Sequence, residues 1–329
     1  MPDPTRHALP ELPRVELLAG PTPLQPLARL SKALGGRVEL WIKREDLGPI
    51  AFSGNKLRNL EFLLGGAIAD RATAIVTAGR RWSNHCRLTA AAGARLGLAT
   101  HIVISGPAHP SPNLELIQLF GGIVHQAETD ARAEREELMR RVAAQLRDDG
   151  RRVEVFPVGG STAIGAWGQV LAALELADQA EREHAAVDLL VLASATGGTQ
   201  AGLLVGAALG FTPPPRVLGV VASDGAPELH ATLESKVREL AAMVGIEPPV
   251  DRIELDDGQI GEGYGQPTAA SQAAAQLLAR TEGILVDPIY TAKALAGLID
   301  LVRSGAIDGK RAVFWHGGGL PSLFETSTS

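Results

Sequence analysis

The chain alternates short apolar runs with longer stretches in which apolar residues recur every three or four positions. The short runs predict β-strands buried on both faces, and the longer stretches predict amphipathic helices. The predicted strands cover residues 38–43, 74–77, 101–104, 123–126, 153–157, 187–193, 217–221, 284–286 and 312–315. Helical patterns include residues 57–70, 84–96, 112–120, 131–149 and 163–181. This alternation predicts an α/β fold with parallel sheets that carry helices on both faces.

Loops rich in glycine or serine follow several of these predicted strands. They are residues 79–87, 157–162, 195–199 and 316–319. Open parallel sheets bind their ligands at the carboxyl ends of the strands. We therefore expect the four loops to converge on one cleft.

Composition and charge narrow the class of protein. The 329 residues, 45% of them hydrophobic and 21% charged, are enough for a large core divided into two lobes. The net charge of −6 offers no basic excess for nucleic acid or an anionic membrane. No apolar run is long enough to cross a bilayer, so we expect no transmembrane helix. A signal peptide needs an apolar run near the N-terminus, but residues 1–13 contain prolines and charges, so we expect no signal peptide there.

Redox and metal chemistry have few candidate residues. One cysteine, Cys86, excludes an intrachain disulfide and fits a reducing, cytoplasmic compartment. We expect it to be a small buried residue at a helix start rather than a reactive thiol. The histidines are scattered, and no paired His, Cys or carboxylate motif predicts a metal site.

The loop at residues 195–199 has the composition of a phosphate site. It reads Ala-Thr-Gly-Gly-Thr and joins a buried apolar strand to a helical stretch. Small residues at a helix start let backbone N–H groups point at an anion. The loop lacks the Gly-Lys-Ser/Thr ending of a P-loop and the three spaced glycines of a dinucleotide site. It therefore favours a single phosphate, although a tight strand-to-helix turn has the same composition.

Lys56 stands between a Gly-rich turn and a predicted helix, in Ser53-Gly54-Asn55-Lys56. The positive end of a helix and burial both disfavour an ammonium group, and a lysine that loses its proton can form a Schiff base with an aldehyde. Alone, Lys56 is more typical of a solvated surface lysine. The phosphate loop elsewhere in the chain shifts the balance toward a functional lysine.

These motifs resemble those of the D-cysteine desulfhydrase and 1-aminocyclopropane-1-carboxylate deaminase family of pyridoxal-phosphate enzymes. The resemblance spans nearly the whole chain, through residues 13–17, 20–24, 42–46, 54–58, 83–85, 157–161, 197–202, 263–265, 285–291 and 318–324. It implies fold type II, with two open, twisted, mainly parallel sheets and pyridoxal 5′-phosphate in the cleft between the lobes. It also implies a homodimer, a large domain of residues 1–48 and 162–329, and a small domain of residues 49–161.

The resemblance also implies roles for individual residues. Lys56 matches the Schiff-base lysine and the base at Cα. The catalytic set is Lys56, Ser83, Tyr264 and Tyr290. The cofactor set is Lys56, Asn84, Ala195, Thr196, Gly197, Gly198, Thr199 and Thr291. The substrate set, for a small amino acid, is Asn55, Trp82, Ser83, Asn84 and His85.

One position favours a branch of the family. The cyclopropane deaminases have a glutamate beside the pyridine nitrogen, where this chain has Thr291. A neutral partner makes a weaker electron sink, which suffices when a good leaving group departs from Cβ. We therefore expect α,β-elimination, giving pyruvate, ammonia and sulfide from cysteine. Open alternatives are β-replacement, L-cysteate sulfo-lysis, cyclopropane ring opening and a non-catalytic amino-acid-binding protein.

The chain departs from the family pattern around the expected site. Trp82 replaces a glutamine and follows Arg80 and Arg81, which either bind a second anionic group or point to solvent. Gly317 replaces a threonine that faces the pyridine nitrogen, and Asn59 replaces a lysine near the phosphate. We expect these positions to influence the choice of substrate and the affinity for the cofactor.

Overall fold

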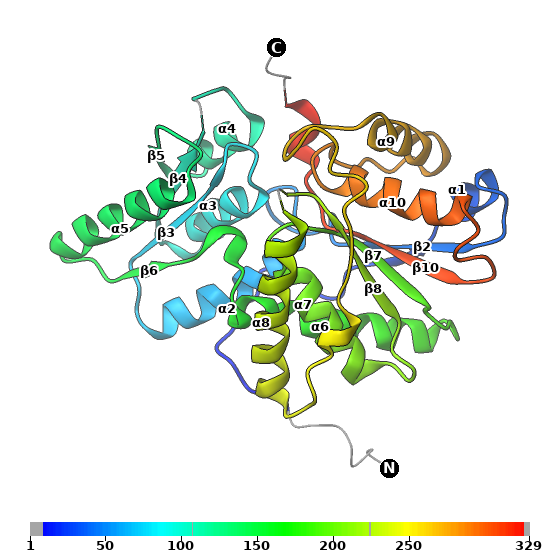
Figure 1. Cartoon of the computed structure of the whole chain (residues 1–329). Helices are drawn as coiled ribbons and strands as arrows, with labels where there is room; N and C mark the ends of the chain where they lie inside the picture. Colours follow the sequence, from blue (N-terminus) through cyan, green and yellow to red (C-terminus); the bar gives the residue numbers. More distant parts are fainter. Residues whose placement is uncertain (1–8, 107, 224, 326–329) are drawn as a thin grey trace.

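The computed structural model describes residues 9–106, 108–223 and 225–325, and its strands form two separate sheets (Figure 1). The strands are β1 (Leu24–Pro26), β2 (Glu39–Arg44), β3 (Ala74–Arg80), β4 (Ala99–Ser105), β5 (Ile123–Gln126), β6 (Val153–Val155), β7 (Leu189–Ser194), β8 (Arg216–Val221), β9 (Glu254–Asp256) and β10 (Arg311–His316). The larger sheet has the order β1-β2-β10-β7-β8-β9, and the smaller has the order β5-β4-β3-β6. Every strand pairing is parallel except that of β1 with β2.

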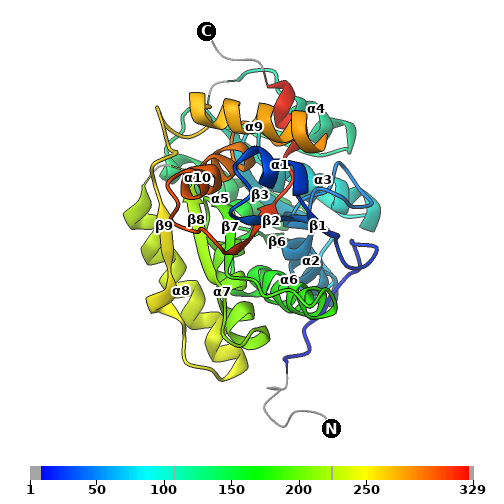
Figure 2. The ribbon, with the colours of Figure 1, turned by 90° about the vertical axis from the view of Figure 1, so that its right-hand side faces the viewer.

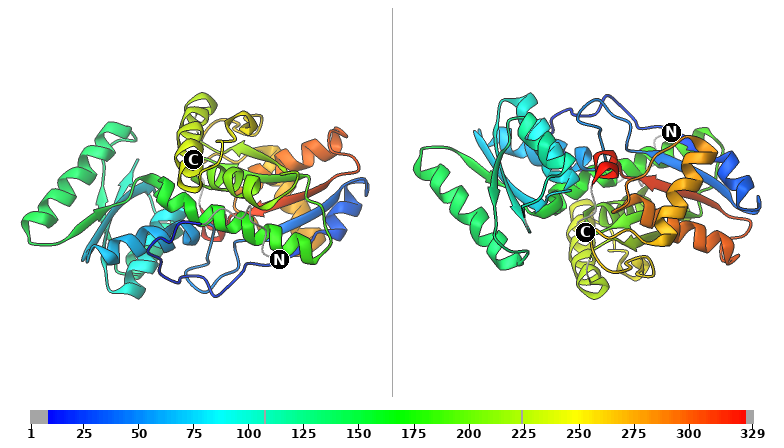
Figure 3. Two further views of the ribbon diagram at one scale, coloured as in Figure 1. Left: turned by 90° about the horizontal axis from the view of Figure 1, so that it is seen from below. Right: turned by 90° about the horizontal axis from the view of Figure 1, so that it is seen from above.

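The helices cover both sheets. They are α1 (Ala28–Ala33), α2 (Lys56–Ala69), α3 (Asn84–Leu96), α4 (Pro112–Leu119), α5 (Arg132–Asp148), α6 (Ala163–Arg182), α7 (Gly198–Gly210), α8 (Ala226–Val244), α9 (Ala269–Glu282) and α10 (Thr291–Arg303). Short 3₁₀ turns lie at Val158–Gly160, Val250–Arg252 and Leu320–Phe324. Figure 3 shows the two lobes side by side from below and from above. The predicted α/β class with two mainly parallel sheets is confirmed. No helix among the described residues is long and apolar enough to cross a membrane.

The central strand β7 explains why its sequence is apolar at consecutive positions. Leu190 and Leu192 belong to the core between the large sheet and helices α6 and α7. Leu189 and Val191 belong to the core on the opposite face, under α10. Figure 2 shows α9 and α10 on one side of these strands and α6 and α7 on the other. Because both faces are covered, the strand has no polar face.

Helix α2 leads the chain from the large lobe into the small one and packs closely on α6. At the contact, a Cβ on Gly168 would lie 2.0 Å from the backbone oxygen of Arg58, so only glycine permits this approach. The close packing fixes the start of α2 relative to the large sheet. The division of the chain at residues 48/49 and 161/162 stays a prediction.

Most predicted elements are found within a few residues of their expected bounds, but residues 284–286 form no strand. Val286 is buried in the core, as its apolar character indicates. The backbone oxygen of Leu285, however, accepts a hydrogen bond from Nε2 of His316 at 2.8 Å instead of pairing with a neighbouring strand. The edges of the larger sheet are already taken by β1 and β9, which the apolar pattern did not predict because their sequences, Leu-Gln-Pro and Glu-Leu-Asp, contain no apolar run. The expectation that residues 1–13 hold no signal peptide falls partly on residues 1–8, which lie outside the described part of the chain.

Candidate active site

A cavity of about 530 Å³ lies between the lobes, and all four predicted strand-end loops contribute to its walls. Most of the residues selected from the sequence line it: Asn55, Lys56, Ser83, Asn84, His85, Ala195, Thr196, Gly197, Thr199, Tyr264, Tyr290 and Thr291. They come from both sheets and from the loop before α9. The carboxyl ends of parallel strands therefore meet here, as expected for this type of sheet.

The turn before α2 presses against the loop that follows β10. Gly54 has a φ of +136°, and a Cβ there would lie 2.9 Å from the backbone oxygen of Gly317. The backbone N–H of Asn55 donates to that same oxygen at 3.1 Å. The Asn55 side chain donates from Nδ2 to Oγ1 of Thr199 at 2.8 Å. These contacts fix the first residue of α2, Lys56, opposite the start of α7.

Lys56 lies partly buried in the cavity wall, and no salt bridge to it is found among the described residues. Burial lowers the pKa of its ammonium group from 10.5 to about 8, because the charged form loses hydration without gaining a counter-ion. A lysine in this state has a much larger neutral fraction near physiological pH than an exposed lysine. It is suited to attack a carbonyl carbon and to accept a proton.

The loop at residues 195–199 forms a cup of backbone donors at the start of α7. Gly197 stands just before the helix with a φ of +77°, which a side chain would strain. No side chain within the described part of the chain caps this helix start, so its first N–H groups are available for an anion. The opposing Ser161 hydroxyl donates to the backbone oxygen of Thr196 at 2.6 Å and holds the loop in place.

The loop before α3 places three polar side chains in the cavity wall. Ser83 caps α3 by accepting a hydrogen bond from the backbone N–H of Cys86, which leaves the Ser83 hydroxyl proton free to be donated. Oδ1 of Asn84 accepts from Arg87 at 2.6 Å, so its NH₂ group is the remaining donor. Burial lowers the pKa of His85 to about 3, so this ring is neutral, and its Nε2 lies 3.0 Å from Oγ1 of Thr77.

Tyr264 and Tyr290, far apart in the sequence, meet through their hydroxyl groups in a direct hydrogen bond. Burial raises the pKa of both phenols, so both stay protonated at physiological pH. Trp82 lies behind this pair and contacts the Tyr264 ring edge-on, with the ring centroids 5.7 Å apart. The pair is thus a rigid, neutral proton donor in the cavity wall.

Several residues singled out from the sequence lie outside the cavity lining. Trp82 is one, because it packs behind Tyr264, and Gly198 is another, because it is buried as the first residue of α7. Arg81 stacks over the Trp82 ring at 4.6 Å. Asn59 is fully buried and accepts from Nε2 of Gln169 at 2.6 Å. Cys86 is buried too, and burial raises its pKa to about 12, as befits an unreactive thiol.

The structure also reveals an ion network beneath the site that the sequence did not indicate. Arg58, two residues after Lys56, donates to Glu45 at 2.6 Å and to Glu175 at 3.0 Å. Lys43 donates to the same Glu175 at 2.5 Å. The network joins α2 to β2 and α6 and so fixes the helix that carries Lys56. The only hint in the sequence was the run of charges at residues 43–46, within an otherwise apolar strand region.

Comparison with known proteins identifies the family. The family model described as "Pyridoxal-phosphate dependent enzyme" matches residues 15–318. The chain belongs to the pyridoxal-phosphate dependent enzymes. This enzyme is 40% identical to a D-cysteine desulfhydrase of Salmonella paratyphi B over 328 residues, with 97% of each chain covered. It is also 40% identical to a D-cysteine desulfhydrase of Yersinia pseudotuberculosis serotype O:1b over 329 residues, again with 97% of each covered.

A solved structure supports the same placement of the enzyme. The crystal structure of an ACC deaminase homologue matches this pyridoxal-phosphate dependent enzyme with a TM-score of 0.89 and 34% identity, and the match covers 95% of this chain and 94% of the other. The predicted family and its cofactor are thereby confirmed. The enzyme is a pyridoxal-phosphate dependent lyase.

The residues present fit the cofactor. Beyond Lys56 and the donor cup, several cavity-lining residues have a buried polar atom with no hydrogen-bond partner among the described residues, and Oγ of Ser194 and Nε1 of Trp315 are two of these atoms. Buried polar atoms are seldom left unpaired, so they indicate a polar ligand at this place. A phosphate at the cup and an aldehyde at Lys56 match the donors available.

Proposed function

We propose that this enzyme removes the β-substituent of a small amino acid by α,β-elimination, as a D-cysteine desulfhydrase does. With cysteine as substrate, the products are pyruvate, ammonia and sulfide. The observation that carries the proposal is Lys56, whose pKa is lowered to about 8 in a cavity it shares with the donor cup of residues 195–199. An amine of this kind serves first as a nucleophile and then as a base.

Bound pyridoxal phosphate supplies an aldehyde for the amine and an electron sink for the charge that develops at Cα. The backbone N–H groups at the start of α7 would hold its phosphate. The Lys56 amine would hold the aldehyde and, once the substrate amine has taken its place, remove the proton from Cα. The NH₂ group of Asn84 would donate to the cofactor's phenolic oxygen, and the Ser83 hydroxyl would donate to the substrate carboxylate, because both donors are left unused by their protein hydrogen bonds.

The paired phenols would act on the leaving group. Tyr264 and Tyr290 share a hydrogen bond and both stay protonated, so either is able to donate a proton to a departing sulfur atom. Neutral His85 and Asn55 would line the substrate side of the cavity without adding charge.

Cyclopropane ring opening is the second candidate, favoured by the likeness to an ACC deaminase homologue. It needs the stronger electron sink that a carboxylate at the position of Thr291 provides in that branch of the family. β-Replacement and L-cysteate sulfo-lysis use the same residues and stay open beside it. Elimination from a substrate with a good leaving group is the reaction that a hydroxyl at position 291 best supports.

A substrate panel tests the proposal. The holoenzyme is incubated with D-cysteine, L-cysteine, L-cysteate and 1-aminocyclopropane-1-carboxylate, and sulfide, sulfite and 2-oxo acids are measured. We expect sulfide and pyruvate in equal amounts from one enantiomer of cysteine. A 2-oxo acid formed from the cyclopropane substrate alone would overturn the proposal in favour of the deaminase, and sulfite with pyruvate from L-cysteate alone would favour the sulfo-lyase.

Three expectations about the whole protein remain proposals. A homodimer and the division into domains at residues 48/49 and 161/162 are supported by the family resemblance. A cytoplasmic location is supported by the single, buried and reduced Cys86. Analytical ultracentrifugation tests the first of these, and a monomer at assay concentration would contradict it.

A further inference from the structure

The small-lobe wall of the cavity carries three arginines, which the proposed reaction does not use. Arg80 ends β3, and Arg132 and Arg135 lie in the first turn of α5. All three line the same cavity as Lys56. The partial positive charge at a helix start repels basic side chains, so arginines placed there need an anionic partner to offset this repulsion.

Two of the three arginines are neutralised within the wall. Arg80 forms a salt bridge with Asp130, and Nε of Arg132 donates to Glu136 at 2.6 Å. The carboxylate of Glu134, the acidic residue of the first turn, instead accepts hydrogen bonds from the backbone N–H groups of residues 128 and 129. Of these three arginines, one has no salt bridge to a carboxylate among the described residues.

That cation is Arg135. No salt bridge to it is found among the described residues, and its Nε is buried without a hydrogen-bond partner. The hydrogen bond found for its side chain among the described residues is a long one, 3.4 Å from Nη1 to Oγ of Ser105. Burial and the charge of Arg80 lower its pKa by more than the charge of Glu136 raises it.

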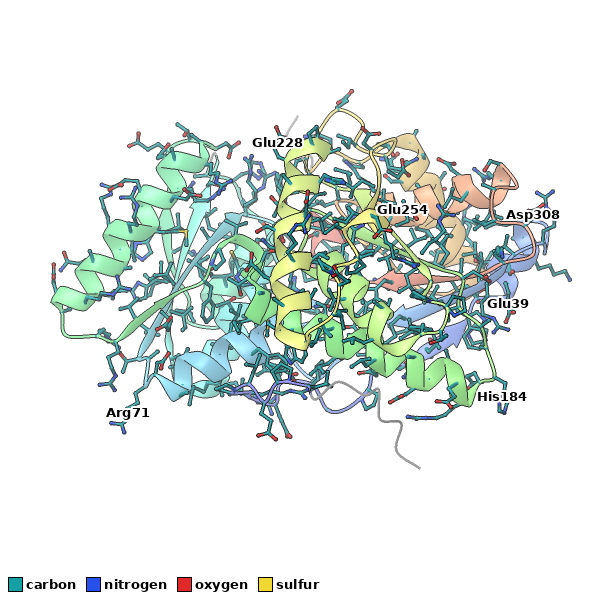
Figure 4. The ribbon with its side chains drawn as sticks, turned by 60° about the horizontal axis from the view of Figure 1, so that its bottom comes forward. Glu39, Arg71, His184, Glu228, Glu254 and Asp308 are labelled. Carbon is teal, nitrogen blue, oxygen red and sulfur yellow. The ribbon has the colours of Figure 1, made fainter. Side chains whose placement is uncertain are left out.

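The charges on the facing wall do not compensate Arg135. That wall is α8, which contributes Glu228 and Lys236 to the cavity. Glu228 lies at one end of α8, as Figure 4 shows, and its Oε2 turns back to the helix start, 2.3 Å from where a Cβ on Gly225 would stand. Lys236 adds a second positive charge.

The arginine wall adjoins the tyrosines. The guanidinium of Arg80 lies over the Tyr264 ring, with Cζ 5.9 Å from its centroid, and Tyr264 is bonded to Tyr290. In the proposed function, which this step rests on, these phenols stand at the leaving group. We propose that Arg135, supported by Arg80, is a specificity residue that binds an oxyanion carried on the β-substituent of the substrate. Beside cysteine, the enzyme then also accepts β-substituted alanines whose substituent ends in a phosphate or a similar oxyanion.

The chemistry needs no further reactant. The Cα–H bond breaks with its proton passing to Lys56, and the bond from Cβ to the substituent breaks with its electron pair leaving on the anion. Water then converts the enamine that remains into pyruvate and ammonia. For O-phosphoserine and one water, the products are pyruvate, ammonia and inorganic phosphate.

Arg135→Gln tests the inference against two substrates. The kcat/KM for pyruvate formation is measured with both enantiomers of O-phosphoserine and of uncharged O-acetylserine, in the wild type and the variant. Loss of a charge-assisted hydrogen bond should lower the value for phosphoserine about tenfold or more and leave that for acetylserine within about twofold. Arg135→Lys should recover part of the loss because it keeps the charge. Arg140→Gln, on an exposed arginine of the same helix, is the matched control and should change neither.

Sulfate binding separates this inference from the proposed function. Inorganic sulfate should raise the melting temperature of the wild-type holoenzyme and of Arg140→Gln, but not that of Arg135→Gln. Equal losses on both substrates, or a sulfate effect that survives in Arg135→Gln, would overturn the inference while elimination itself stands. If no amino acid is turned over but the sulfate effect depends on Arg135, the proposed function fails and the anion subsite stands.

Discussion

The hydroxyl of Thr291 donates a hydrogen bond of 2.5 Å to Oδ2 of Asp287, a carboxylate that is completely buried. The backbone N–H of Asp287 donates back to the same hydroxyl oxygen at 2.9 Å. The Thr291 proton is thus directed away from the cavity, and only a lone pair faces a ligand. Thr291 is suited to accept a hydrogen bond, with a carboxylate behind it to increase the basicity of its oxygen.

Asp287→Asn should disturb both the hydrogen bond between Thr291 and Asp287 and the turn that carries Tyr290. The Asp287 carboxylate also accepts from the backbone N–H groups of residues 289, 290 and 291, and the NH₂ group of asparagine cannot accept. Leaving buried donors unpaired should lower the free energy of unfolding by about 1–3 kcal/mol. Denaturant unfolding measures this, and Asp257→Asn, at an exposed position, is the control that should show no change.

Lys56→Ala should abolish turnover and the visible absorbance that the cofactor gains when the lysine holds it. Because Lys56 is both the attachment point and the base, we expect a loss of at least about 10²–10⁴-fold in kcat. Absorbance spectra and pyruvate formation measure the two roles. Lys32→Ala, on α1, should behave as the wild type. Substantial residual turnover in Lys56→Ala would mean that another residue is the base.

The lowered pKa of Lys56 predicts how the attachment of the cofactor depends on pH. The neutral amine is the reactive form, so the rate at which apoenzyme binds pyridoxal phosphate covalently should rise with pH and level off above about 8. Stopped-flow absorbance measures this rate. If it keeps rising toward the ordinary lysine value of 10.5, Lys56 is hydrated and not desolvated by its surroundings.

Arg58→Met should destabilise the enzyme, because it leaves the buried Glu45 carboxylate without its cation. Removing one partner of a buried ion pair typically costs about 3–5 kcal/mol. Thermal unfolding measures the loss, and cofactor binding should weaken with it because α2 is no longer fixed. Arg238→Met removes an exposed pair with Glu234 and should leave the melting temperature unchanged.

Glu175 should account for part of the stability that the folded enzyme loses in acid. Burial alone would raise its pKa, but Arg58 and Lys43 outweigh burial and lower it below 4.5. A carboxyl with a lowered folded-state pKa contributes stability that is fully present above the unfolded value and is lost as the pH falls through the folded one. Below a pH of about 4.5, the free energy of unfolding should therefore fall less steeply with decreasing pH in Glu175→Gln than in the wild type. An unchanged slope would show that the ion network does not carry this stability.

Much of the fold was readable from the sequence because local patterns report burial. Strand β7 is apolar throughout since both its faces are covered, and α3 begins at Asn84 because Ser83 supplies its cap. Residues 284–286 misled the prediction because an apolar run reports burial of side chains and not pairing of the backbone. Strands β1 and β9 were missed because Leu-Gln-Pro and Glu-Leu-Asp contain no apolar run that would indicate burial.

The sequence by itself determined the family, the cofactor and the lysine that holds it, since each depends on residue types at fixed local spacing. The tertiary structure decided what surrounds that lysine. Trp82 lies behind Tyr264, Asp287 stands behind Thr291, and Nε of Arg135 has no hydrogen-bond partner among the described residues of the cavity wall. These contacts join residues far apart in the chain, and the physical reason is that burial, pKa and unpaired charge depend on neighbours that only the packing of the two lobes brings together.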